Sequence, residues 1–133
     1  MTRDEINKLI DFNIDKLSSF SRVHLYKENS YKFLELLLPS TFDESLKIIK
    51  EDYKIFPGGI ISAIYDAFKQ YIYNQKDSDA LFYQLLKVIY SLDCSQYGED
   101  ILPILKYGAL SYDTSILKLI INITISLMDN KIK

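Results

Sequence analysis

The sequence predicts an all-α domain of about six or seven helices. Two stretches support this most strongly, residues 80–92 (ALFYQLLKVIYSL) and residues 115–128 (SILKLIINITISLM), because both are apolar around almost the whole circumference of a helix. Their clearly polar positions recur every three or four residues and form one narrow stripe on each: Gln84, Lys87 and Ser91, and then Ser115, Lys118, Asn122 and Ser126. Helices with so little polar surface usually lie inside a bundle, so we expect these two to form the core.

A β-strand is the alternative that the second stretch offers. Within residues 120–125, isoleucines alternate with Asn and Thr, which is the period-two pattern of a half-buried strand. The apolar pattern continues on both sides, however, and exceeds ordinary strand length. We therefore predict a helix here and find no convincing strand elsewhere.

Length and composition predict one globular domain over residues 1–133. A chain of this size buries about two-thirds of the surface that it exposes when unfolded, so it needs neither a metal nor a disulfide to fold. The net charge of −2 and the pI near 5.4 argue against a non-specific nucleic-acid binder. Cys94 is the only cysteine, which rules out an internal disulfide and favours a reducing compartment.

Neither end of the sequence suggests a membrane or an export signal. The first residues, MTRDEINKL, are charged from the third position and contain no apolar run, so we expect no signal peptide. The longest apolar stretch, residues 116–128, is interrupted by Lys118 and Asn122 and is too short to span a bilayer. The expected location is the cytoplasm.

The first half of the chain is predicted to contain four elements. A capping box at residues 2–5 begins an outer helix that ends near residues 18–21. Residues 30–38 form a short buried element that Pro39 ends. A second capping box at residues 41–44 opens a helix through about residue 54. The Pro57-Gly58-Gly59 triplet predicts a turn, and another helix follows over residues 60–74.

The second half alternates polar turns and helices. Residues 75–79 are a polar turn in which Ser78 or Asp79 caps the first core helix. Residues 93–98 are a loop, and a helix covers residues 99–110, with Pro103 in about its first turn and Gly108 near its end. Residues 111–114 form a turn before the second core helix, which runs to about Asp129.

A shift of 35 residues superimposes the two core stretches. Leu81 then falls on Ile116, Leu85 on Ile120, Leu86 on Ile121, Val88 on Ile123, Ser91 on Ser126 and Leu92 on Leu127, while Asp79 falls on Thr114. Such an interval is typical of stacked helical hairpins of the HEAT or armadillo type, which have few fixed residues. The sequence leaves two arrangements open for the C-terminal half, stacked hairpins and a plain irregular bundle.

No motif in the sequence indicates catalysis or cofactor binding. His24 is the only histidine, and its neighbours suggest a surface or edge position. One His and one Cys nearly exclude a zinc site. We expect negative charge and a helix end to raise the pKa of Cys94, which disfavours a nucleophile. Gly58-Gly59 lacks the strand and Lys-Ser/Thr of a phosphate loop.

Acidic pairs and one glycosylation-like pattern have plain structural explanations. The pairs Asp43/Glu44, Glu51/Asp52 and Glu99/Asp100 are expected at helix starts or on solvated faces, with a catalytic dyad as the less favoured alternative. Asn122-Ile123-Thr124 matches a glycosylation acceptor, but it lies in a predicted buried helix.

Residues 77–117 have a local net charge of −4, from six acids and two lysines. The acids fall in turns and helix starts: Asp77, Asp79, Asp93, Glu99, Asp100 and Asp113. If the helices alternate in direction, the first two and the last gather at one end of a layer and the other three at the opposite end. One explanation is that helix starts favour Asp and Glu. The other is an acidic rim, with Tyr97 and Tyr112 beside it, that binds a basic partner.

In overall character, and in the hairpin-like stretch over residues 79–128, the chain resembles the all-α immunity proteins of bacterial contact-dependent inhibition and related polymorphic toxin systems. The resemblance implies a non-enzymatic protein that binds a basic toxin domain and covers its active site. It implies no cofactor and no nucleic-acid or membrane partner.

Two other functions remain open at this point. A helical adaptor or oligomer subunit of phage or plasmid origin needs only an exposed apolar patch. A small enzyme that acts through carboxylates needs a deep pocket lined by ionisable groups with shifted pKa values.

Overall fold

The computed structural model describes residues 17–37, 42–73 and 79–132. Within these ranges the chain forms seven α-helices, one 3₁₀-helix and no strand, which confirms the all-α prediction. The helices are α2 (Ser19–Glu28), α3 (Ser30–Glu35), α4 (Phe42–Ile55), α5 (Pro57–Tyr73), α6 (Asp79–Ser91), η2 (Ser95–Tyr97), α7 (Gly98–Gly108) and α8 (Thr114–Ile132). The start of the outer helix predicted from residues 2–5 lies outside the described residues. Of the capping box predicted at residues 41–44, Phe42, Asp43 and Glu44 are described and lie at the start of α4.

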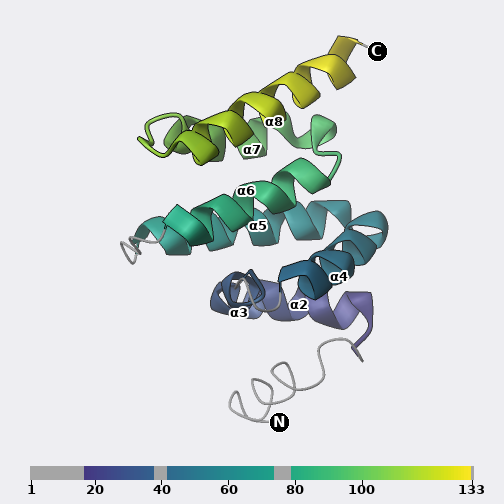
Figure 1. Ribbon diagram of the computed structural model, residues 1–133. Helices are drawn as coiled ribbons and strands as arrows, with labels where there is room; N and C mark the ends of the chain where they lie inside the picture. Colours follow the sequence, from purple (N-terminus) through teal and green to yellow (C-terminus); the bar gives the residue numbers. More distant parts are fainter. Residues whose placement is uncertain (1–16, 38–41, 74–78, 133) are drawn as a thin grey trace.

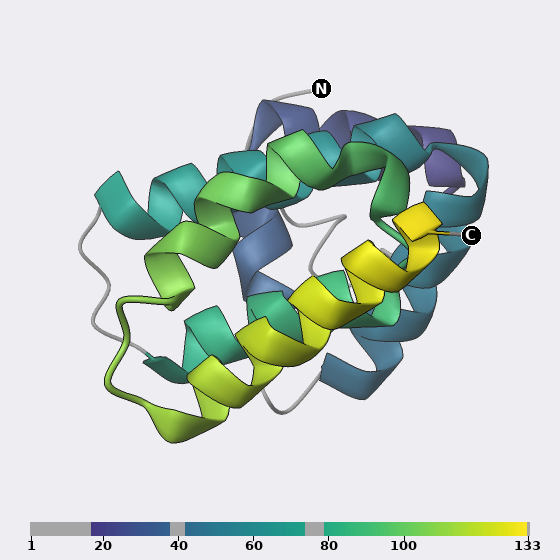
Figure 2. The same ribbon diagram turned by 90° about the horizontal axis from the view of Figure 1, so that it is seen from above.

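The helices form three tiers, which Figure 1 shows from the side. Helices α2, α3 and α4 make one end of the stack, α5 and α6 the middle, and α7 and α8 the other end. Helix α5 packs against α2, α3 and α4 on one side and against α7 on the other. Seen along the stack, α7 lies over α5 and α8 over α6 (Figure 2). The middle tier is therefore the part of the fold with neighbours on both sides.

The last four helices are arranged as two stacked hairpins. Helices α6 and α8 begin at Asp79 and Thr114, which is the 35-residue shift found in the sequence, and the contact between α6 and α8 is extensive. Both helices start at the same side of the stack, and α7, which connects them in the chain, runs in the opposite direction (Figure 1). Gly108 brings α7 close to its neighbours, since a Cβ there would lie 2.6 Å from the Ile120 Cδ1 atom.

The prediction that both apolar helices are interior is right for α6 and wrong for α8. Six residues of α6 are buried, including Leu85 and Leu86. On α8 only one face is buried, formed by Ile116, Leu119, Ile120 and Ile123. The other face is exposed because α8 is the last helix of the stack and has neighbours on one side only.

The predicted polar stripe of α6 is also partly covered. Gln84 is 9% exposed, and its Oε1 atom has no hydrogen-bond partner. The Lys87 ammonium lies 5.5 Å from the centre of the Phe42 ring and 5.0 Å from that of Tyr83. Because α4 packs against α6, this stripe faces another helix as well as solvent.

Helix α2 is an element that the sequence analysis does not predict. Its start is capped by Ser18, whose Oγ atom accepts a hydrogen bond from the Ser21 backbone N–H at 3.1 Å. Its buried residues are Val23, Tyr26 and the charged Arg22. A charged residue on the buried face hides the apolar period by which a helix is recognised in a sequence.

Two predictions about proline need correction. The Pro57-Gly58-Gly59 triplet does end α4, but it is the first turn of α5 and not a loop, because a proline at the first helical position has no N–H bond to lose. Gly59 lets α5 approach α2, since a Cβ there would lie 2.6 Å from the Val23 Cγ1 atom. Pro103 lies beyond the first turn of α7, which begins at Gly98.

The stacked core gives a first testable prediction. Leu85→Ala or Ile120→Ala should lower the free energy of unfolding by about 2–5 kcal/mol, because each side chain is at least 93% buried and leaves a cavity. Ile55→Ala at the exposed end of α4 is the control and should cost less than about 0.5 kcal/mol. Urea unfolding followed by circular dichroism measures all three, and a small loss for both buried positions would contradict the packing.

Candidate protein-binding surface

The edge at which α6 leads into α7 carries half of the residues predicted to bind a partner: Asp93, Tyr97, Glu99 and Asp100. We call these four residues the α6–α7 edge. Glu99 and Asp100 are exposed and lie in the first turn of α7, where carboxylates complement the helix dipole. The Tyr97 ring is half-buried and packs against the core.

Asp93 at this edge organises the loop before α7. One of its carboxylate oxygens, Oδ1, accepts hydrogen bonds from the Ser95 hydroxyl at 2.8 Å and from the Ser95 backbone N–H at 3.3 Å. Its backbone carbonyl accepts a hydrogen bond from the Tyr53 hydroxyl of α4. Burial raises the pKa of Tyr53, so that this hydroxyl stays protonated and acts as a donor. Asp93 thus has a structural role in addition to its charge.

The predicted acidic rim is not purely acidic on this side. A hollow of about 610 Å³ lies beside Asp93 and Tyr97, and its other wall includes Lys50 and Lys54 of α4. The two lysines come from a part of the sequence far from the acidic segment, so the local charge count did not include them. The acidic charge free of nearby α4 lysines is therefore at the start of α7, on Glu99 and Asp100, with Lys106 about two turns further along that helix.

Three of the remaining predicted residues, Asp79, Tyr112 and Asp113, lie at the opposite side of the stack, where α6 and α8 begin (Figure 1). Asp113 caps α8, with its Oδ1 atom accepting from the Ser115 and Ile116 backbone N–H groups at 2.8 and 3.1 Å. Asp79 is exposed in the first turn of α6, and Tyr112 is fully exposed. Asp77 lies outside the described residues. The acids thus form two separate groups, as alternating helices require.

The strongest polar interaction in the described chain is one that the sequence analysis missed. Arg22 of α2 and Asp52 of α4 form a two-pronged ion pair: Arg22 Nε lies 2.8 Å from Asp52 Oδ2, and Nη2 lies 2.7 Å from Oδ1. The Arg22 and Asp52 side chains are 4% and 0% exposed. Hydrogen bonding to Asp52 raises the pKa of Arg22. The expectation that Asp52 lies on a solvated face or at a helix start is therefore wrong, although Glu51 is exposed.

Arg22 also binds residues at the start of its own helix. Its Nη1 atom also donates to the Leu17 carbonyl at 2.6 Å and its Nη2 atom to the Ser19 hydroxyl at 3.3 Å. The Tyr26 hydroxyl, one turn later, is buried without a hydrogen-bond partner, and burial raises its pKa. No sequence signal links Arg22 to Asp52, because the two lie 30 positions apart and on different helices. The pair fixes how α2 sits on α4.

The sole cysteine and the sole histidine have the characters that the sequence predicts. Cys94 is 2% exposed, and its pKa is raised to about 11. Burial is the main cause, and the charge of Asp93 is a lesser one. The His24 side chain is 63% exposed, with its Nε2 atom 3.9 Å from Glu28 Oε1. It lies on the surface of α2.

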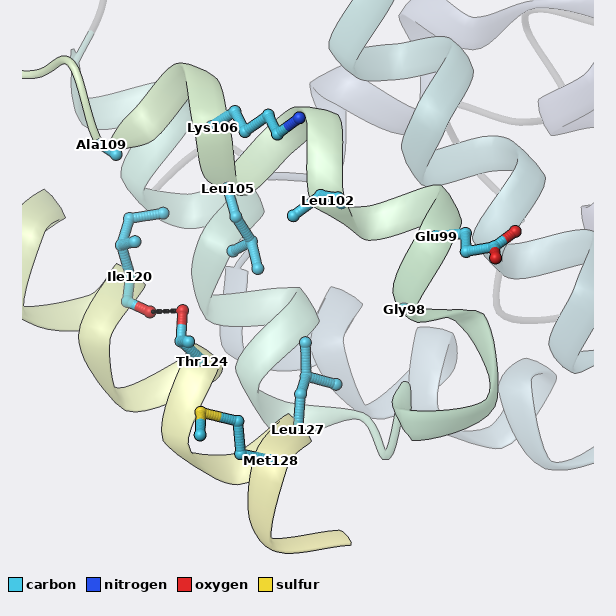
Figure 3. A pocket seen from close by; sticks show the side chains of 10 residues that line it. All are labelled: Gly98, Glu99, Leu102, Leu105, Lys106, Ala109, Ile120, Thr124, Leu127 and Met128. Atoms are coloured by element: carbon cyan, nitrogen blue, oxygen red, sulfur yellow. Dashed lines mark hydrogen bonds between the residues drawn. The ribbon is translucent and has the colours of Figure 1, made fainter. Parts of the chain in front are cut away.

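An apolar groove between α7 and α8 was not predicted. It has a volume of about 440 Å³ and lies between Leu102 and Leu105 of α7 and Leu127 and Met128 of α8 (Figure 3). Glu99, which belongs to the α6–α7 edge, also lines the groove. Leu102 and Met128 are 46% and 57% exposed.

No group of three or more His, Cys, Asp or Glu side chains suited to a metal ion occurs in the described ranges. Of the helices described, none combines the length and apolar character that crossing a membrane requires. Comparison with known protein families, with curated proteins and with solved structures finds no match.

The buried ion pair gives a second prediction. Arg22→Met should lower the free energy of unfolding by about 3–5 kcal/mol, because it leaves the Asp52 carboxylate buried without its partner. Replacing both residues, with Arg22→Met and Asp52→Leu, should recover much of that loss because no charge stays buried. Urea unfolding measures both, with His24→Ala on the exposed face of α2 as the control. An Arg22→Met cost near that of His24→Ala would contradict the role of the pair.

The buried thiol gives a third prediction. At pH 8, alkylation of Cys94 by iodoacetamide should be at least about a hundredfold slower in the folded protein than in urea, since the pKa is raised from 9.0 to about 11 and the sulfur is covered. Mass spectrometry of the alkylated fraction over time gives both rates. Equal rates would show that Cys94 is accessible.

Proposed function

We propose that this chain is a non-catalytic protein-binding module, and specifically an immunity protein that neutralises a basic toxin domain by direct binding. The observation that carries the proposal is the pair of exposed carboxylates, Glu99 and Asp100, at the start of α7. The Asp113 carboxylate accepts hydrogen bonds that cap α8, and in the described part of the chain no such capping bond is formed by Glu99 or Asp100. Exposed charges at one edge are suited to attracting a partner of opposite charge.

In this proposal the α6–α7 edge acts in two steps. The carboxylates of Glu99 and Asp100 speed the encounter with a basic surface through long-range attraction. The half-buried ring of Tyr97 then provides apolar contact area that is already ordered by the core, so little side-chain entropy is lost on binding. Inhibition follows from covering the partner's active site and needs no chemistry by this chain.

The lysines beside Asp93 limit where the partner sits. Lys50 and Lys54 would repel a basic surface, and so would Lys106 further along α7, so the contact centres on Glu99 and Asp100 at the start of α7. The opposite group of acids is less suited to the task, since the Asp113 carboxylate is already used as a helix cap. We therefore assign partner binding to the α7 side of the α6–α7 edge.

A matched pair of variants tests this proposal. Glu99→Gln with Asp100→Asn removes both charges at the start of α7, and Asp43→Asn with Glu44→Gln removes the same two residue types from the first turn of α4. Each tagged protein is used to capture partners from a lysate of the native host, and the captured proteins are identified by mass spectrometry. A basic partner held by the wild-type and α4-variant proteins should associate about tenfold more slowly with the α7 variant at low salt.

Salt provides the second arm of the same test. The association rate of wild-type protein should fall clearly between about 0.05 and 0.5 M salt, because the Debye length shrinks well below the size of the interface. The α7 variant should respond less. Equal capture rates for the two variants, or a salt-independent rate for the wild type, would refute binding through the α6–α7 edge.

A second candidate function is favoured by a different observation, the exposed isoleucines of α8. A helical adaptor or oligomer subunit makes its contacts through an apolar face, and Ile121 and Ile125 are 57% and 51% exposed. Such a contact depends little on salt, which separates it from the first candidate.

A further inference from the structure

The outward face of α8 combines apolar side chains with charges of both signs. Ile121, Ile125 and Met128 are all more than half exposed, and Lys118 and Asp129 are exposed beside them. With 3.6 residues per turn, these five positions share one side of the helix, opposite the buried residues described above. The face is therefore a continuous stripe along α8 and not a scatter of single exposed residues.

The helical stack explains why this stripe is apolar. Ile121 is the counterpart of Leu86 in the 35-residue repeat, and Leu86 is 0% exposed while Ile121 is 57% exposed. The counterpart of Ile125 is Tyr90, which is 50% exposed, so the comparison concerns Ile121. Helix α8 covers α6, whereas α8 itself is the outermost helix of its tier (Figure 1). The last unit of a helical stack usually has a polar outer face, since nothing packs on it. An apolar position that is covered in one unit and exposed in the next is suited to packing against another apolar surface.

The order of residues along the stripe identifies that surface. The positions 118, 121, 125 and 128 are separated by three, four and three residues, so the spacing reads the same in both directions. When a second α8 runs antiparallel to the first, Ile121 of one copy faces Ile125 of the other. Lys118 then comes next to Met128 and Asp129 of the second copy, which brings opposite charges together at both ends of the contact.

We propose that the outer face of α8 binds a second copy of this chain, with the two α8 helices antiparallel about a two-fold axis between Ile121 and Ile125. Such a contact is isologous, so each half supplies the complement of the other and the assembly stops at two copies. This inference deepens the second candidate function and is independent of the first. The mixed charges also distinguish this face from a site for a basic partner, which would meet Lys118.

The contact consists of one helix face on each copy, whereas a standard-size stable interface buries about 800 Å² on each partner. We expect a weak dimer, with a dissociation constant on the order of 10 µM. The groove adjoins the stripe through Met128 and extends the apolar surface toward Leu102 (Figure 3).

Sedimentation equilibrium of the full chain between about 1 and 300 µM tests the proposal. The wild-type protein should pass from monomer to dimer over this range, and Ile121→Ser with Ile125→Ser should weaken dimerisation at least twentyfold. Ile55→Ser on α4 is the control, since Ile55 is the same residue type and 57% exposed, like Ile121. Circular dichroism should show the same helix content for all three, because the replaced side chains are exposed.

A charge swap tests the antiparallel arrangement. Lys118→Glu alone and Asp129→Lys alone should each weaken dimerisation several-fold, and the two together should restore it to within about threefold of the wild type. A wild-type protein that stays monomeric overturns the proposal, and so does an Ile121/Ile125 variant that dimerises like the Ile55 control. Failure of the combined swap to restore dimerisation overturns the antiparallel arrangement. None of these results affects capture through the α6–α7 edge, which depends on Glu99 and Asp100.

Discussion

The rest of the structure depends on the apolar packing of the middle tier, formed by α5 and α6. Helix α5 contacts three helices of the first tier and one of the last, and Ile60, Ile64 and Ala67 along it are fully buried. Helix α6 likewise contacts α4 of the first tier and α8 of the last tier. Burying a large aliphatic side chain contributes about 1.5–3 kcal/mol, so a helix covered on both sides supplies far more stabilisation than a surface helix of equal length. The helices of both outer tiers are positioned by their contacts with α5 and α6.

The two end tiers differ in the contacts that hold their helices in place. At the first end, the Arg22–Asp52 pair adds a directional contact to the apolar packing of α2 on α4 and α5. A two-pronged ion pair tolerates little rotation, so it specifies orientation more than it adds stability. At the other end, the buried face of α8 is formed by aliphatic side chains, and its outward face exposes Ile121, Ile125 and Met128. The candidate interaction surfaces lie around α7 and α8, because the exposed apolar residues of α8 and the exposed carboxylates of α7 are at this end.

The two candidate surfaces meet at the groove between α7 and α8. Glu99 belongs to the α6–α7 edge, and Met128 belongs to the outer face of α8, yet both line the same groove (Figure 3). A partner attracted by charge and a second copy held by apolar contact would thus approach neighbouring parts of one end of the molecule. The contacts remain physically separable, because charge attraction weakens with salt while apolar contact does not. Their separation rests on which residues each uses: Glu99 and Asp100, or Ile121 and Ile125.

The fold class, the places of α5 to α8 and the 35-residue relation between α6 and α8 could be read from the amino-acid sequence, because these follow from the local period of apolar residues. The exposure of His24 and the direction of the Cys94 pKa shift were also predicted, although the main cause of that shift is burial, which no local charge pattern shows. Only the tertiary structure decided which face of α8 is covered, since an isoleucine is equally apolar whether or not a neighbour packs on it. The same holds for Arg22 and Asp52 and for the lysines beside Asp93, where charges distant in the chain meet and no local pattern records their contact.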